Sequence, residues 1–522
     1  MRTRLANGLI VLVRRDPSAP VVAIVTLVRA GYFDETDDVV GISHVLEHMY
    51  FKGTPSRGVG EIAKETKAAG GYLNAGTIYD HTSYYTVLPS SSFEAGLDVQ
   101  ADAYAHSLID SGELARELEV IIQEAKRKAD NPTAVATETL YELLHDRHRI
   151  RRWRIGREPG LRALRQDDVV GFYRNFYRPG NTILAIVGDV DPDEVLADVN
   201  RRYGALAAGD PTRSPGPSED GAGGPGFRHR ELTGDIAQTQ VAFGWRTPGT
   251  NHADTPALEL LAGVLAAGRA SRLYRAVRER RLASAVSAHH YTPTEIGVFV
   301  AHAETPPDAA ADAARAIWDQ IRAARDGEIG DHELERAKRV FESRWIRRLE
   351  DMEGQANHLA EWEALGDWRI GDDYFERVML ATRDDVTRVA KEYLAADRAG
   401  VVVYRPATTD PVAASGEAML ALLDREPRPA PLAPPPAYAA RILPGATSPE
   451  FVGEVAGVFE YRTQDGTPIL VRTKPGSPIV HAGAFIIGGV RDEESALSGL
   501  TTLMVRAALK GTSSRSAEQI AE

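Results

Sequence analysis

The chain has 522 residues, of which 43% are hydrophobic and 26% are charged, as in an ordinary soluble globular protein. Acidic residues outnumber basic residues by 74 to 61, and this net charge of −13 argues against a nucleic-acid partner, which would need a basic face. The absence of cysteine excludes disulfides and thiolate ligands, so any metal must be held by His, Asp or Glu. No apolar run is long enough for a transmembrane helix, so no membrane span is predicted.

The first part of the chain alternates strand and helix patterns. We expect the strands IVLVRR and VVAIVTLVRAG, the helices GISHVLEHMYF and EIAKETKAA, a hairpin from GYLNAGTI and HTSYYTVL, and then long amphipathic helices. The later part repeats this style with strand TQVAFGW, helix ALELLAGVLAA and strands SAVSAHHYT and GVFVAHAE. Helices and hairpins within one unit predict an α+β fold built on mainly antiparallel sheets.

Two stretches rich in proline and glycine divide the chain. Residues 209–226 have the composition of a flexible linker, and residues 425–454 begin with repeated prolines that favour a stiff, extended spacer. A chain of this length also exceeds what one hydrophobic core serves. We therefore expect a first domain at 1–208, a second at 227–424 and a third segment at 455–522.

The motif HVLEH carries the strongest chemical signal. On a helix, His44 and His48 lie one turn apart on the same face, so both rings can reach one metal ion, and Glu47 lies beside them. A catalytic Zn²⁺ takes three N/O ligands and leaves its fourth position to a water molecule, whose proton Glu47 can accept. The alternative is a surface helix with two solvated histidines.

A third ligand must come from another segment. Glu124 is the candidate, in ELEVIIQEAKRKADNP, where we expect Val120, Ile121 and Ile122 to form one buried stretch of a helix. Glu117 lies seven residues earlier on the same helix face. Two half-buried acids are costly unless a cation or hydrogen bonds satisfy them, which favours a metal site.

These motifs together resemble the insulinase/pitrilysin family of zinc metallopeptidases. The family's inverted His-x-x-Glu-His motif is followed here by NAGTIYDHTSYY, which matches its strand motif, and by a glutamate pair at the family's spacing. Further on, LAAGRASRLYRAVRERRLASAVSA resembles a segment of the family's second domain.

The resemblance implies a zinc endopeptidase that holds one Zn²⁺ per chain. It implies that His44, His48 and Glu124 bind the metal, that the catalytic pair comprises Glu47 as general base and Glu117 as a supporting acid, and that Asn74, Ala75 and Thr77 lie on a strand whose edge binds extended peptide substrates. An ordinary hairpin is the alternative for that strand.

The fold expected from this resemblance is a pair of tandem homologous domains that form half of a clamshell chamber. A second half of the same chain, or a homologous subunit, would close the chamber around peptides. One departure is that Ser284 stands where many members carry a Tyr, six residues after Arg278, so we assign neither residue a catalytic role.

Residues 461–522 repeat residues 3–64 without a gap, at a constant offset of 458. The repeat retains glycines and the Lys-Gly-Thr sequence, but Thr502, Val505 and Arg506 replace the three residues of the zinc motif. This pattern predicts a duplicated domain without zinc, similar to the silent half of long family members. We therefore expect the chain to be a piece of such a protein, truncated at its C-terminus.

Other functions remain open at this stage. The chain could be a weakly active or inactive subunit that binds peptides, because the family includes members that have lost the motif. Residues 147–157 form a basic cluster that is either a solvated face or a contact for acidic substrate segments. No signal peptide is visible at the N-terminus, so the compartment is left open between cytoplasm and periplasm.

Overall fold

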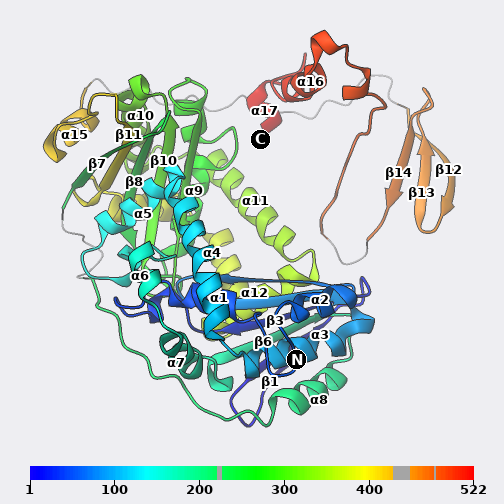
Figure 1. The fold of residues 1–522 in the computed structure, drawn as a ribbon. Coiled ribbons are helices and arrows are strands. Elements are labelled where there is room, and N and C mark those ends of the chain that lie inside the picture. The colour runs from blue at the N-terminus through cyan, green and yellow to red at the C-terminus, as the bar shows by residue number, and fades with distance from the viewer. Residues whose placement is uncertain (220–225, 427–446, 475–477, 522) are drawn as a thin grey trace. The chain divides into compact units, whose positions relative to one another are not determined.

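The structure is a computed structural model that describes residues 1–219, 226–426, 447–474 and 478–521 (Figure 1). The chain forms two compact units, residues 1–432 and residues 433–522. Across the described ranges no helix combines the length and the apolar character needed to cross a bilayer.

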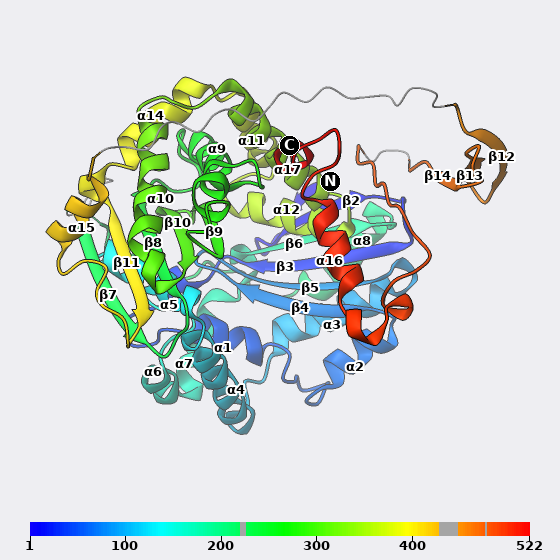
Figure 2. The ribbon, with the colours of Figure 1, turned by 90° about the horizontal axis from the view of Figure 1, so that it is seen from above.

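A six-stranded sheet organises the first part of unit one. Its strands lie in the order β1-β2-β6-β3-β5-β4, and all neighbours are antiparallel except β2 and β6. Figure 2 shows β4 as an outermost strand of this sheet. The strands are β1 (Arg2–Arg4), β2 (Ile10–Arg15), β3 (Val21–Val28), β4 (Tyr72–Thr77), β5 (Thr82–Pro89) and β6 (Thr182–Gly188).

Helices cover both faces of this sheet, and they come from distant parts of the chain. On one face, alternate β3 residues such as Val22 and Ile24 pack against α1 (Ile42–Met49) and α3 (Phe93–His106). On the other face, Ala23 and Val25 pack against Ala356 of α12 (Met352–Ala364). Because β3 is buried on both faces, it is apolar along nearly its whole length.

A second sheet, of five strands in the order β7-β11-β8-β10-β9, is also covered by helices on both faces. One face packs against α9 (Thr255–Ala266) and α10 (Ala310–Arg325), and the other packs against α5 (Pro132–Leu144), which belongs to the earlier part of the chain. The two parts of unit one therefore exchange helices, since α5 covers the later sheet and α12 covers the earlier one. The strands are β7 (Arg228–Gly234), β8 (Thr239–Thr247), β9 (Ala285–Tyr291), β10 (Gly297–Thr305) and β11 (Gly400–Pro406).

The remaining helices of unit one surround these layers. They are α2 (Glu61–Ala68), α4 (Ser111–Ala129), α6 (Glu158–Ala163), α7 (Gln166–Phe176), α8 (Pro192–Tyr203), α11 (Asp331–Arg348), α13 (Ile370–Leu380), α14 (Arg383–Tyr393) and α15 (Gly416–Leu423).

The prediction of an α+β fold is confirmed, and the expected strands and helices are present. Two local expectations were wrong. Val120 is 45% exposed while Ile121 and Ile122 are fully buried, because three consecutive helical residues cannot all face one core. Within the basic cluster, Arg149 and Arg152 are buried instead of solvated.

These two arginines bind backbone carbonyls of the segment before α1. Arg152 donates to the carbonyls of Tyr32 and Glu35 at 2.6 and 3.0 Å, and Arg149 donates to the carbonyl of Phe33. Buried guanidinium groups need such acceptors, so the cluster anchors the segment that leads into α1.

The predicted linkers lie partly outside the described residues, at 220–225 and 427–446. The described part of the first one makes specific contacts. Arg213 pairs with Asp34, and Glu219 accepts hydrogen bonds from the N–H groups of Arg147 and His148 at 2.6 and 2.7 Å.

Unit two contains a three-stranded antiparallel sheet and two helices. They are β12 (Glu450–Val455), β13 (Val458–Arg462), β14 (Pro468–Arg472), α16 (Leu500–Ala508) and α17 (Ala517–Ala521). The register of β13 and β14, which pairs Arg462 with Pro468, equals that of β1 and β2, which pairs Arg4 with Ile10, after a shift of 458 residues.

Backbone details of the two segments agree at the same shift. Gly41 and Gly499 both have a positive φ, 97° and 98°, immediately before their helices. Glu35 accepts the N–H groups of the residues six and eight positions later at 3.0 Å, and Glu493 does so at 2.7 Å. The two segments therefore share local structure as well as sequence.

Candidate metal centre

Helix α1 carries His44, Glu47 and His48 near one end of the first sheet. Ile42, Val45, Leu46 and Met49 bury the opposite side of the helix in the core. The helix begins after Gly41, whose φ of 97° and whose proximity to the carbonyl of Ile155 leave no room for a Cβ. A buried Glu35 carboxylate then accepts the N–H groups of Gly41 and Ser43, so the helix start is fixed from two sides.

Helix α4 brings its two glutamates to the same place. Asp110 caps this helix by accepting the N–H groups of Gly112 and Glu113, and the buried Ile121 and Ile122 fix its rotation. Glu117 and Glu124, two turns apart, consequently face α1. The structure thus brings together all four residues predicted to form the centre and its support.

The three predicted ligands converge on a single point. One ligand atom each from His44, His48 and Glu124 lie within 4.8 Å of one another. Oε2 of Glu124 is 3.8 Å from Nε2 of His44 and 3.6 Å from Nε2 of His48. Two atoms bound to a tetrahedral zinc ion lie about 3.3 Å apart, so these separations fit a zinc ion with a small adjustment.

Hydrogen bonding and burial prepare the imidazoles for a metal. Nδ1 of His48 lies 3.1 Å from Oε2 of Glu117, an arrangement that places the proton on Nδ1 and leaves the Nε2 lone pair free. Burial, followed by the nearby His48 and Lys128, lowers the pKa of His44 to about 3, so its ring is neutral. Nδ1 of His44 is buried and has no hydrogen-bond partner among the described residues.

Glu117 is itself held in its ionised form. Burial opposes ionisation, but hydrogen bonds from Lys52 and His48 outweigh it and lower the pKa of this carboxyl. Lys52 had no predicted role. It lies one turn after His48, and this spacing is the sequence feature that could have indicated its contact with Glu117.

Glu47 lies beside the metal ligands without joining them. Thr77 at the end of β4 donates a hydrogen bond to Oε2 of Glu47 over 2.5 Å. Burial raises the pKa of Glu47, which makes its carboxylate a stronger base than an exposed one. The arrangement suits a group that takes a proton from a water molecule.

The three residues predicted to bind substrate all lie on β4, at the edge of the sheet. Asn74 is exposed, and its side-chain oxygen accepts the N–H of Ala75 at 2.9 Å. Thr77 instead contacts Glu47, so its side chain faces the candidate metal centre. Of the two positions left unassigned, Ser284 donates to the carbonyl of Glu304 at 3.1 Å.

Two family descriptions match consecutive parts of this chain. The description "Insulinase (Peptidase family M16)" matches residues 10–153, and "Peptidase M16 inactive domain" matches residues 163–341. A protein of Mycobacterium tuberculosis named "Uncharacterized zinc protease" is 30% identical over 411 residues, which are 78% of this chain and 93% of that protein. This chain belongs to the M16 family of peptidases.

Other similar proteins match over a comparable share of this chain. A Rickettsia felis protein, also named "Uncharacterized zinc protease", is 28% identical over 75% of this chain and 94% of its own length. The crystal structure of a protease from Helicobacter pylori matches with a TM-score of 0.74 and 26% identity, over 78% of this chain and 99% of that one. A structure from Pseudomonas fluorescens, described as a peptidase M16 inactive domain, shares the fold at 19% identity and a TM-score of 0.71, over 79% of this chain and 98% of that one.

Proposed function

We propose that this chain is a zinc metalloendopeptidase that cleaves extended peptides or small unfolded proteins. The observation that carries the proposal is the meeting of His44, His48 and Glu124 around one point, with the half-buried Glu47 beside them. Membership of the M16 family and the zinc-protease names of its relatives support it.

One Zn²⁺ ion held by these three ligands would polarise the scissile carbonyl and lower the pKa of a water molecule to about 7. Glu47 accepts the proton from this water and returns it to the leaving amine. Thr77 fixes the orientation of the Glu47 carboxylate, and Glu117 fixes the tautomer of His48.

The peptide would bind in extended form along the free edge of β4. Within the described part of the chain, one side of the β4 backbone has no strand partner, and its N–H and C=O groups can pair with a peptide. Asn74 and Ala75 lie on this edge. A second half of the chain, or a homologous subunit, would close the chamber over the bound peptide.

The test compares zinc content and peptide cleavage in matched variants. Glu47→Gln is expected to keep zinc and lose turnover of a quenched fluorescent peptide, because it keeps the ligands and removes the base. Alanine at position 44, 48 or 124 is expected to lose zinc and activity together. His332→Ala, which changes an exposed histidine outside the site, is the control and keeps both.

Three outcomes distinguish the possibilities. Zinc in the parent and in Glu47→Gln, with cleavage only by the parent, supports the enzyme. Zinc without cleavage in either protein favours the second candidate, an inactive peptide-binding subunit. Absence of zinc from the parent after metal reconstitution rejects the proposed metal site.

A further inference from the structure

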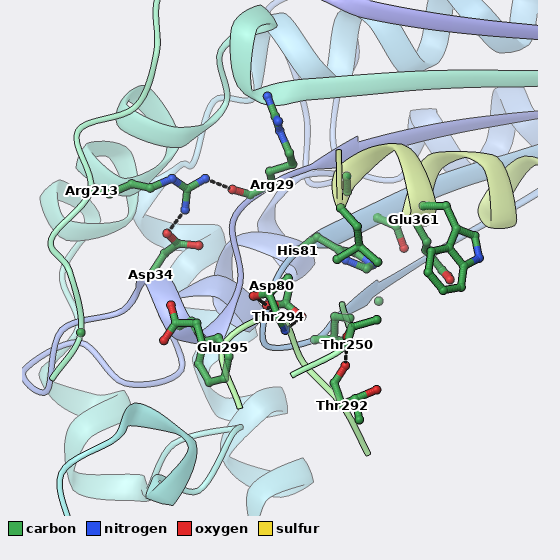
Figure 3. A pocket seen from close by; sticks show the side chains of 18 of the residues that line it. Arg29, Asp34, Asp80, His81, Arg213, Thr250, Thr292, Thr294, Glu295 and Glu361 are labelled. Atoms are coloured by element: carbon green, nitrogen blue, oxygen red, sulfur yellow. Dashed lines mark hydrogen bonds and ion pairs between the residues drawn. The ribbon is translucent and has the colours of Figure 1, made fainter. Parts of the chain in front are cut away.

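A polar cavity of about 540 Å³ lies in unit one beside the candidate active site (Figure 3). Its lining includes the turn between β4 and β5, the C-terminal end of α12, the loop before β10 and residues 213–216. The proposed function makes no use of this cavity. Its lining contains three arginines and four carboxylates, so its charge balance decides what it can bind.

Strand β4 connects the cavity to the proposed peptide-binding edge. Side chains alternate along a strand, so Gly76 faces the side opposite to Thr77, whose hydroxyl contacts Glu47. Gly76 and Ile78 line the cavity, and a Cβ built on Gly76 would meet nothing within 4 Å. The missing side chain at Gly76 therefore leaves the cavity open toward the strand.

Pairing geometry fixes which part of a bound peptide meets this opening. Residues directly opposite each other on paired antiparallel strands project their side chains from the same face. A peptide residue opposite Gly76 would direct its side chain into the cavity, while its neighbours face the metal side. Because Thr77 touches the general base, that residue lies about one or two positions from the scissile bond.

Two arginines of the lining pair with carboxylates, and the third binds a backbone carbonyl. Arg213 pairs with Asp34, and Arg348 pairs with Glu361. Arg29 donates to the carbonyl of Gly180 at 2.8 Å, and Figure 3 shows its guanidinium directed away from Asp80.

Two carboxylates of the lining have no lysine or arginine partner among the described residues. Asp80 accepts hydrogen bonds only from the N–H and hydroxyl of Thr294, and Glu295 contacts the imidazole of His148 at 2.9 Å. Burial raises the pKa of Asp80 to about 6; its bonds with Thr294 oppose this, and the charges of Glu295 and Asp34 add to it. The four carboxylates of the lining outnumber its three arginines by one, so the lining carries a net negative charge, and the charges of Arg149 and Arg213 favour the ionised form of Glu295.

His81 gives a second, independent indication of a ligand. This residue is only 9% exposed and lines the cavity, but its ring makes no hydrogen bond with any described residue. Burial lowers the pKa of His81, so the ring is neutral and one ring nitrogen can accept a hydrogen bond. In Figure 3 the ring lies between Asp80 and Glu361.

We propose that this cavity is a specificity subsite that binds a cationic nitrogen of the peptide, in which Asp80 and Glu295 balance its charge and His81 accepts a hydrogen bond. The inference rests on the proposed peptidase function and deepens it, because it names the substrate class. The volume accommodates a long side chain, so lysine or arginine opposite Gly76 is the expected occupant, and the peptide's α-ammonium group offers the same chemistry.

The experiment uses the full chain and quenched fluorescent peptides of one length. Lysine, norleucine or glutamate is placed in turn at each position flanking the scissile bond, with free and acetylated N-termini. At one position, kcat/KM is expected to be at least about tenfold higher for lysine than for norleucine, which has a similar shape without the charge. A preference that survives acetylation identifies the side chain, and one that acetylation removes identifies the α-ammonium group.

Variants of the cavity localise the effect. Asp80→Asn and Glu295→Gln should each reduce the ratio of lysine to norleucine by about tenfold through KM, with zinc content unchanged. Gly76→Phe should close the opening and abolish the preference, whereas Gly76→Ala should retain it. Asp308→Asn, which removes an exposed carboxylate far from the lining in sequence, is the control.

Binding to the Glu47→Gln chain separates this proposal from the peptidase proposal. In that variant, anisotropy of labelled peptides reports the subsite even where no peptide is cleaved. Tighter binding of lysine peptides that Asp80→Asn weakens supports the subsite whatever the turnover. Equal binding of lysine and norleucine peptides at every position, or a preference unchanged by the cavity variants, overturns it.

Discussion

The hydroxyl of Thr77 lies 2.5 Å from Oε2 of Glu47, so a hydrogen bond joins the edge strand β4 to helix α1 of the candidate metal centre. The bond lowers the pKa of Glu47, in opposition to burial, which raises it. One residue of the strand proposed to hold the peptide therefore also orients the base proposed to act on it. This relationship ties substrate position to proton transfer.

Replacing Thr77 tests this connection directly. Thr77→Val keeps the shape and removes the donor, so kcat is expected to fall about tenfold, the usual cost of leaving a charged acceptor unpaired. Because the lost bond had lowered the pKa of Glu47, the acid limb of the pH profile should move to higher pH. Thr77→Ser should restore both quantities, and a valine variant with the parent's profile would remove Thr77 from the mechanism.

Glu117 is expected to act on the metal through His48. Glu117→Leu removes the acceptor for Nδ1 of His48 and should weaken zinc binding by about 10- to 100-fold, measured by competition with a chelator. Glu117→Gln keeps an acceptor oxygen and should weaken it less. Glu119→Gln, on the exposed side of the same helix, should leave the affinity unchanged. Equal affinities in all four proteins would contradict the role.

The sequence predicted which residues cluster at the candidate metal centre because the spacing within each pair is local. His44 and His48 lie one turn apart on α1, and Glu117 and Glu124 two turns apart on α4, so helix geometry alone places each pair on one face. No local spacing in the sequence predicted the contacts between different helices and strands. Nothing in the spacing joined Thr77 to Glu47, and nothing in the amphipathic pattern of α12 showed that it covers the first sheet.

Charge and apolar patterns in the sequence led to wrong expectations about burial where contacts between distant segments determine it. Arg149 and Arg152 belong to a basic run that resembles a solvated face, but backbone carbonyls of residues 32–35 bind them in the interior. The apolar run from Val120 to Ile122 consists of consecutive helical residues, which point in different directions, so Val120 is exposed while the next two are buried. Sequence patterns therefore placed elements correctly and left their partners undefined.

Glu35 should make the stability of the first unit depend on pH. Burial is the largest cause that raises the pKa of this carboxyl to about 7, above the ordinary value of 4.5 that it has in the unfolded chain. The folded state then holds the proton more tightly, so the contribution of Glu35 to stability is greatest at low pH and falls as the pH rises from about 4.5 to about 7. The loss amounts to up to about 3 kcal/mol.

The variant Glu35→Gln isolates this contribution. Glutamine cannot titrate, so thermal unfolding from pH 5 to pH 8 should show the parent losing stability relative to the variant as the pH rises. Glu94→Gln, an exposed acid, serves as the control. Parallel curves for parent and Glu35→Gln would show that the carboxyl keeps an ordinary pKa.

The exchange of helices between the two sheets should couple their stabilities. Ala356 of α12 is fully buried against the first sheet, where Ala23 and Ala185 leave room only for a small side chain. Ala356→Leu overpacks this contact and should destabilise the unit by about 1–3 kcal/mol, whereas Ala115→Leu on the exposed face of α4 should cost little.

Hydrogen exchange reports where the damage from Ala356→Leu spreads. Although residue 356 lies more than 300 positions after β3 in the sequence, the amides of Val25 and Leu27 should lose protection, because α12 covers that face of the strand. Zinc content should stay at the parent's level, since α1 packs on the opposite face. Loss of protection confined to the second sheet would mean that α12 does not stabilise the first one.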